Sequence, residues 1–109
     1  MTPGAGDSYG GKITVFVEED LQELIPGYLE NRVKDIAAIR EALARKDYEA
    51  IRTLGHKMKG SGGGYGFDAI TEIGHGIEEA AKREHGDEIV RLAEELKSYL
   101  ERVDVIYQG

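Results

Sequence analysis

Apolar residues recur every three or four positions through most of the chain, which is the pattern of amphipathic helices. Four long helices are predicted: one over 26–45, one from 48 into the glycine-rich segment 60–66, one opening near 68, and one from about 87 to 103. Asp47 directly precedes the second of these helices and has the side chain of an N-cap. The connections are short, so sequential helices are expected to lie antiparallel.

The chain before these helices is less regular. Residues 1–12 contain four Gly and one Pro, which predicts a flexible tail. Residues 13–17 are mostly β-branched and could run extended against the body of the protein. Leu21, Leu24 and Ile25 predict a short helix from Glu18, and Pro26 separates it from the next helix because proline disfavours helical geometry in the residue before it.

No segment has a strand period long enough to predict a sheet. The predicted fold class is therefore all-α, an up-down antiparallel four-helix bundle with a short extra N-terminal helix. One domain is expected over 13–109, preceded by the flexible tail at 1–12.

The composition restricts the environment and the partners. The chain has no cysteine, which excludes disulfides and cysteine metal sites. Its 21 acidic and 14 basic residues give a net charge of −7, which argues against binding to nucleic acid or to an anionic membrane. No apolar run approaches membrane-spanning length and no basic and apolar leader is visible, so a soluble, cytoplasmic and monomeric protein is expected.

His56 lies on the wrong side of its helix for a core residue. At about 100° per residue, it lies about 150° from the direction of the apolar face of that helix. The imidazole is therefore expected to face solvent. Residues one or two turns away share its face: Arg52, Lys59, Gly60 and Gly63.

The segment around His56 is basic and rich in glycine. Between residues 50 and 67 the chain has three basic residues, Arg52, Lys57 and Lys59, and no acidic residue. This local positive charge suits a negatively charged adduct or an acidic docking surface. Gly60 and Gly63 are expected beside His56, where a side chain would block a second protein. A fraying helix end would explain some of the glycines equally well.

The stretch GHKMKGSGGGYGFDAITEIGHGIEEAA resembles the core of a histidine-containing phosphotransfer (HPt) domain. The family pattern reads His-x-x-Lys-Gly-Ser, then small residues and a glycine, then an apolar residue followed by Glu one helix later. The matching positions here are His56, Lys59, Gly60, Ser61, Gly66, Ile77 and Glu78. The flanking predicted helices fit the bundle of that family in length and order. The triple glycine at 62–64 departs from the bulkier small or polar residues of many relatives.

The resemblance implies an intermediate in a multistep histidine–aspartate phosphorelay. His56 would accept a phosphoryl group from a phospho-aspartate, and Lys59 would offset charge on that group. The implied partners are response-regulator receiver domains and a histidine kinase. Residues expected to dock the partner are Arg52, Lys57, Gly60, Ser61 and Gly63. The chain would not be an enzyme with its own ATP site. It would need no cofactor or metal of its own, with magnesium supplied by the receiver.

The other histidines and the glycine segment allow other interpretations. His75 also points away from its apolar stripe, but Glu78 and Glu79 beside it would repel a phosphoryl group, and His85 lies in a helix connection. The glycine segment is not a P-loop, because its lysine precedes the glycines and a helix precedes the lysine. Two functional alternatives stay open: the phosphoacceptor domain of a chemotaxis-type kinase, and a helical docking module that is not phosphorylated.

Overall fold

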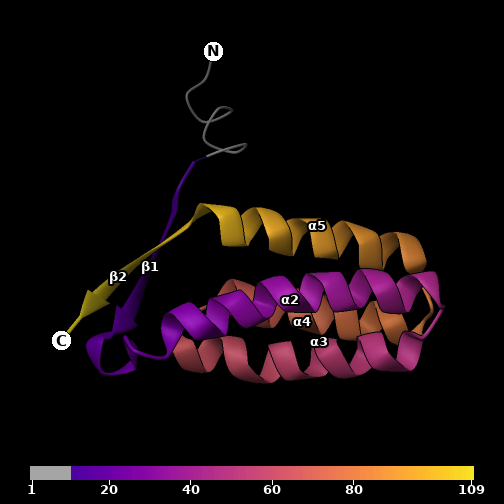
Figure 1. Ribbon diagram of the computed structural model, residues 1–109, viewed down its shortest axis with the longest axis horizontal. Helices are drawn as coiled ribbons and strands as arrows, with labels where there is room; N and C mark the ends of the chain where they lie inside the picture. Colours follow the sequence, from indigo (N-terminus) through magenta and orange to yellow (C-terminus); the bar gives the residue numbers. More distant parts are fainter. Residues whose placement is uncertain (1–10) are drawn as a thin grey trace, which may run out of the picture.

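The computed structural model of the chain describes residues 11–109 as a bundle of four helices with a small sheet at one end. The helices are α2 (Ile25–Ala44), α3 (Tyr48–Gly62), α4 (Asp68–Lys82) and α5 (Gly86–Arg102). Their bounds agree closely with the four predicted long helices. Figure 1 shows the four helices side by side along the long direction of the molecule.

Each helix buries one apolar face in a shared core. Helix α2 packs against α3 and α5, and α4 packs against the same two helices. The centre of the core includes Ile39 of α2, Ile51 of α3, Ile77 of α4 and Leu96 of α5, all completely buried. Burying one such side chain stabilises the fold by roughly 1.5–3 kcal/mol. The predicted three-to-four-residue spacing therefore identifies the core faces correctly.

The α2–α3 and α4–α5 connections are built in the same way. In each, one residue adopts a left-handed conformation, Lys46 with φ 57° and Glu84 with φ 56°. The N–H groups of the next residues, Asp47 and His85, donate to helix carbonyls 2.8 and 2.9 Å away. This is the Schellman motif, which satisfies carbonyls at a helix end and turns the chain sharply. Asp47 then caps α3 as predicted, since its side chain accepts a hydrogen bond from the Ala50 N–H at 3.1 Å.

The predicted short N-terminal helix is not confirmed. In its place the chain makes one 3-10 turn, η1 (Glu19–Leu21), followed by further turns that lead directly into α2. The segment is too short to offset the cost of helix nucleation by itself. Ile25, predicted to end that helix, is instead the first residue of α2 and is buried, while Leu24 is exposed.

A two-stranded parallel sheet stands where no sheet was predicted. Strand β1 (Ile13–Glu18) pairs with strand β2 (Val103–Gln108), which directly follows α5. The alternate residues of both strands face the bundle, with Val17 fully buried, whereas the register partners Phe16 and Ile106 are exposed. The extended conformation expected for 13–17 is confirmed, and the fold is mostly helical as predicted, with this small sheet added to the four helices. The apolar residues Phe16 and Ile106 at outward positions interrupt the alternation of apolar and polar residues, so neither segment shows a clear strand period in the sequence.

The predicted tail at 1–12 falls mostly outside the described residues. Gly11 is described, and its carbonyl accepts a hydrogen bond from Arg102 Nη1 at 3.5 Å. The division of the chain into a tail and a domain stays a prediction. Within residues 11–109, no helix is long and apolar enough to cross a membrane.

Candidate functional site

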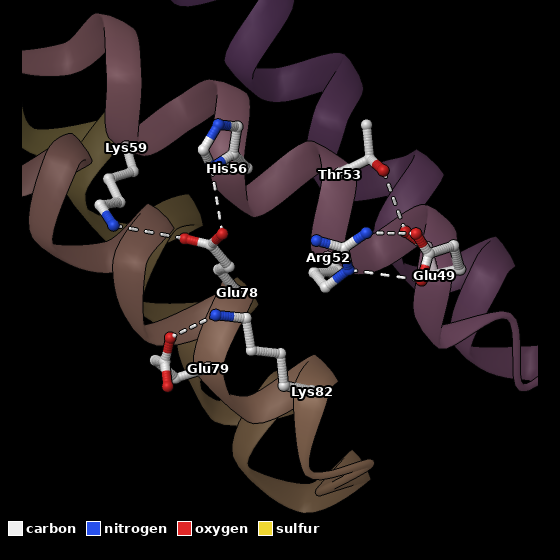
Figure 2. A network of polar contacts seen from close by, with 8 residues as sticks. All are labelled: Glu49, Arg52, Thr53, His56, Lys59, Glu78, Glu79 and Lys82. Carbon is white, nitrogen blue, oxygen red and sulfur yellow. Dashed lines mark hydrogen bonds and ion pairs between the residues drawn. The ribbon is translucent and has the colours of Figure 1, made fainter.

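Helix α3 presents His56 to solvent, as its position on the helical wheel predicts. Ile51, Gly55 and Met58 of α3 are buried, whereas the His56 side chain is 68% exposed. Figure 2 shows the imidazole on the outer side of α3, next to α4. A second protein can therefore reach the ring without any change in the bundle.

Glu78 of α4 contacts the imidazole of His56. Its side chain is only 7% exposed, and its Oε2 atom lies 3.0 Å from Nδ1 of His56. The other carboxylate oxygen, Oε1, lies 3.5 Å from Nζ of Lys59, which comes from the next turn of α3. The buried carboxylate thus joins the two residues predicted to carry the chemistry.

The charge of Glu78 is compensated by these two neighbours. Burial opposes ionisation of the carboxyl, but the hydrogen bond from His56 and the positive charge of Lys59 outweigh it and lower the pKa of Glu78 below its ordinary value. Oε1 is buried and has no hydrogen-bond partner among the described residues, so the Lys59 ammonium is its main compensation. Glu78 is therefore ionised near neutral pH.

The carboxylate also selects the tautomer of His56. An ionised carboxylate accepts hydrogen bonds and cannot donate them, so the 3.0 Å contact assigns the ring hydrogen to Nδ1. In the neutral ring the lone pair is then on Nε2, the nitrogen away from Glu78. The site consequently presents an oriented nitrogen nucleophile on an exposed surface.

The end of α3 is held by a side chain of α4. The Thr71 hydroxyl donates to the Lys59 carbonyl at 3.0 Å and accepts from the Gly63 N–H at 2.7 Å. The chain then passes through the 3-10 turn η2 (Gly63–Tyr65) to Gly66, whose φ of 95° favours glycine. The triple glycine of the sequence therefore belongs to an ordered, tightly joined helix end rather than to a frayed one.

The residues predicted to dock a partner have different surroundings. Lys57, Gly60 and Gly63 are exposed, and a Cβ added at Gly60 would meet nothing within 4 Å. The Ser61 hydroxyl is half-buried and lies 2.9 Å from the hydroxyl of Tyr28 on α2. Lys57 and the two glycines are thus exposed to solvent, while Ser61 links α3 to α2.

Two of the three basic residues near His56 in the sequence are paired with carboxylates in the structure. Arg52 forms an ion pair with Glu49 one turn earlier, and Lys59 pairs with Glu78. Glu49 raises the pKa of the Arg52 guanidinium through its hydrogen bond and its charge. The prediction considered only residues 50–67, whereas one compensating carboxylate lies just before that window and the other on the facing helix. Among the described residues, a single carboxylate, that of Glu78, therefore lies next to His56.

Histidines 75 and 85 are exposed, and among the described residues the hydrogen bond of Glu78 goes to His56 and not to either of them. His75, Glu78 and Glu79 offer ligand atoms within 4.8 Å of one another, the spacing at which a metal ion could be held. Two of these groups already have cationic partners: Glu78 pairs with Lys59, and Glu79 pairs with Lys82 at 3.1 Å. The geometry therefore favours His56 over His75 as the oriented nucleophile.

Glu78 is the residue of the candidate site whose contacts the sequence did not reveal. The resemblance to HPt domains marked its position, but the residue was read only as a neighbour that disfavours His75. Only the packing of α4 against α3 shows that Glu78 is buried, and a buried carboxylate needs a partner.

Comparison with known proteins agrees with this geometry. A family model described as the Hpt domain matches residues 18–105. No curated protein and no solved structure matches the chain. The matched range includes all four helices together with His56, Lys59 and Glu78, and it leaves out residues 13–17 of β1 and the end of β2. Because the match spans most of its length, the chain belongs to the Hpt domain family.

Proposed function

We propose that this protein transfers phosphoryl groups between aspartates of receiver domains, with His56 as the acceptor. The family consists of phosphotransfer modules of phosphorelay signalling rather than enzymes with their own ATP site. The observation that carries the proposal is the His56–Glu78 contact, which leaves Nε2 of an exposed imidazole as an oriented nucleophile. A histidine kinase and response-regulator receiver domains are the proposed partners.

The reaction follows from this arrangement. The Nε2 lone pair attacks the phosphorus of a receiver phospho-aspartate, so that an N–P bond forms while the acyl P–O bond breaks. The aspartate leaves as a carboxylate, and the ring becomes positively charged with its hydrogen still on Nδ1. Glu78 stabilises that charge because its ionised oxygen lies 3.0 Å from Nδ1. Transfer to a second receiver reverses these steps.

Lys59 has two proposed roles. In the resting protein it offsets the buried charge of Glu78 at 3.5 Å. Its side chain is 42% exposed, so the ammonium can also turn toward a phosphoryl group on His56. Stabilisation of a transferring phosphoryl group is mostly electrostatic. Magnesium is proposed to come from the receiver, because the carboxylate nearest to His56 is already paired with His56 and Lys59.

We also propose an arrangement of the helices, a docking surface, an oligomeric state and a cellular location. The four helices are taken as an up-down antiparallel bundle, which the short Schellman turns at Lys46 and Glu84 favour. The docking surface comprises Lys57, Gly60 and Gly63 around His56, with Arg52 at its edge. The protein is proposed to act as a monomer in the cytoplasm.

A two-step transfer experiment tests the proposal. The protein is incubated with a panel of phosphorylated receiver domains, isolated, and then mixed with unlabelled receivers. Label is expected to enter the protein from at least one receiver and to leave it for another. The His75→Gln variant serves as the matched histidine control and should behave as wild type. Absence of label from every phosphorylated receiver would contradict the proposal.

A further inference from the structure

Helices α3 and α4 meet through glycines at the level of the candidate site. Gly55 of α3 and Gly74 of α4 are both buried. A Cβ added at Gly55 would lie 2.7 Å from the Glu78 backbone N and 2.8 Å from the Gly74 carbonyl oxygen. A Cβ added at Gly74 would lie 2.5 Å from the Lys59 backbone N and 2.8 Å from the Gly55 carbonyl oxygen. Real Cβ atoms do not approach backbone atoms this closely.

The two glycines lie at the contact between α3 and α4, next to His56, Glu78 and Lys59 in the chain and in space. Gly55 immediately precedes His56, and Gly74 begins the turn of α4 that ends at Glu78. The atoms that an added methyl group would meet include backbone atoms of Glu78 and Lys59 themselves. The turn of α3 that carries His56 therefore packs directly against the turn of α4 that carries Glu78.

We infer that Gly55 and Gly74 are positioning residues for the phosphoacceptor. Helix pairs normally keep a separation set by the side chains at their contact. With no side chain on either glycine, the backbones approach closely enough for the buried Glu78 carboxylate to reach Nδ1 of His56 at 3.0 Å. A methyl group at either position separates the helices and withdraws the carboxylate from the ring. This role differs from that of Gly60, which faces open space.

The inference rests on the proposed function for its biological meaning, but its test reads the His56–Glu78 contact directly. The test variants are Gly74→Ala and Gly55→Ala, and Glu78→Ala serves as the reference for a broken contact. The matched control is Gly76→Ala, which adds the same methyl group to α4 but toward the flexible Leu92 side chain, 3.1 Å from its Cδ1. Gly27→Ala on α2, where the added Cβ meets nothing within 4 Å, is the second control.

The primary measurement is the nitrogen-15 spectrum of the His56 ring near neutral pH, which reports the tautomer without any phosphoryl transfer. Both test variants are expected to move the ring signals from the wild-type positions toward those of Glu78→Ala, while both controls keep the wild-type positions. Rates of phosphorylation by a receiver that labels the wild type are expected to fall about tenfold to a hundredfold in the test variants, as for other small displacements of a reacting group.

Two results would overturn the inference. One is a folded Gly74→Ala or Gly55→Ala protein with wild-type His56 ring signals. The other is failure of both variants to fold, because the glycines would then hold the bundle as a whole and not the His56–Glu78 pair in particular. Altered ring signals in a protein whose wild type takes no label would refute the proposed function and leave the positioning role standing.

Discussion

The Nδ1 atom of His56 lies 3.0 Å from Oε2 of Glu78, and the two residues come from different helices. The side chain of His56 is 68% exposed, whereas Glu78 is the buried charged residue of α4. The contact places the hydrogen of the His56 ring on Nδ1, and Nε2 stays accessible to a partner. In the proposed reaction, this chain orients the His56 ring and the receiver delivers the phosphoryl group.

The contribution of Glu78 to transfer is tested by Glu78→Gln. The neutral amide cannot stabilise the positive charge that develops on the ring, so the rate of phosphorylation of His56 is expected to fall by at least about tenfold. Glu79→Gln is the matched control, because Glu79 is the next residue of α4 and pairs with Lys82 instead. Equal rates for both variants in a stopped-flow or rapid-quench assay would show that the carboxylate has only a structural role.

The lowered pKa of Glu78 predicts an acid-dependent loss of stability. A carboxyl whose pKa is lower in the folded state contributes stability above its unfolded pKa, near 4.5, and loses that contribution as the pH falls through its folded pKa. The free energy of unfolding of wild type is therefore expected to decline more steeply below about pH 4.5 than that of Glu78→Gln. Parallel curves from urea titrations over pH 3–7 would contradict this assignment.

Lys59→Ala is expected to affect both stability and transfer. The variant leaves Oε1 of Glu78 buried without its cationic neighbour, so we expect a loss of about 1 kcal/mol in the free energy of unfolding. For a domain of this size that loss corresponds to a fall of about 4–8 °C in Tm. Transfer is expected to slow as well. Lys34→Ala, on the exposed part of α2, should change neither quantity by more than a small amount. A wild-type transfer rate in Lys59→Ala would restrict this residue to a structural role.

Gly60→Leu tests whether the open surface beside His56 receives a partner. A Cβ added at this position meets nothing within 4 Å and leucine favours helix over glycine, so the Tm is expected to stay the same or rise. Transfer from a receiver domain is expected to fall sharply, because the side chain occupies the surface that the receiver must cover. Gly27→Leu, equally open but on α2, is the control. If both variants accept the phosphoryl group at the wild-type rate, the partner docks elsewhere.

The helices and the exposure of His56 could be predicted because each depends on spacing within one segment. The Asp47 cap follows from residue type and position in the same way. The β1–β2 pairing could not be predicted, because its two strands are joined only through the folded bundle. The short N-terminal helix was predicted from Leu21 and Leu24 without regard to its length, and a single 3-10 turn forms there.

The residues of the candidate site on α3 could be predicted from the sequence, but their partner on α4 could not. Periodicity places His56 and Lys59 on the same face of α3, but it does not say which residue of α4 lies opposite. That depends on how closely the helices approach, which Gly55 and Gly74 determine. The same limit explains the overestimated positive charge, since Glu78 compensates Lys59 only after the helices have packed.

The most direct test of the account is to find which atom takes the phosphoryl group. Nitrogen-15-labelled protein is phosphorylated with a receiver domain that labels it, and the modified ring is identified by the splitting of its nitrogen signal by phosphorus-31. The account predicts an acid-labile, base-stable adduct on Nε2 of His56, with no adduct in the correctly folded His56→Gln variant. An adduct on Nδ1 of His56, or label that persists in His56→Gln and disappears only in His75→Gln, would contradict it.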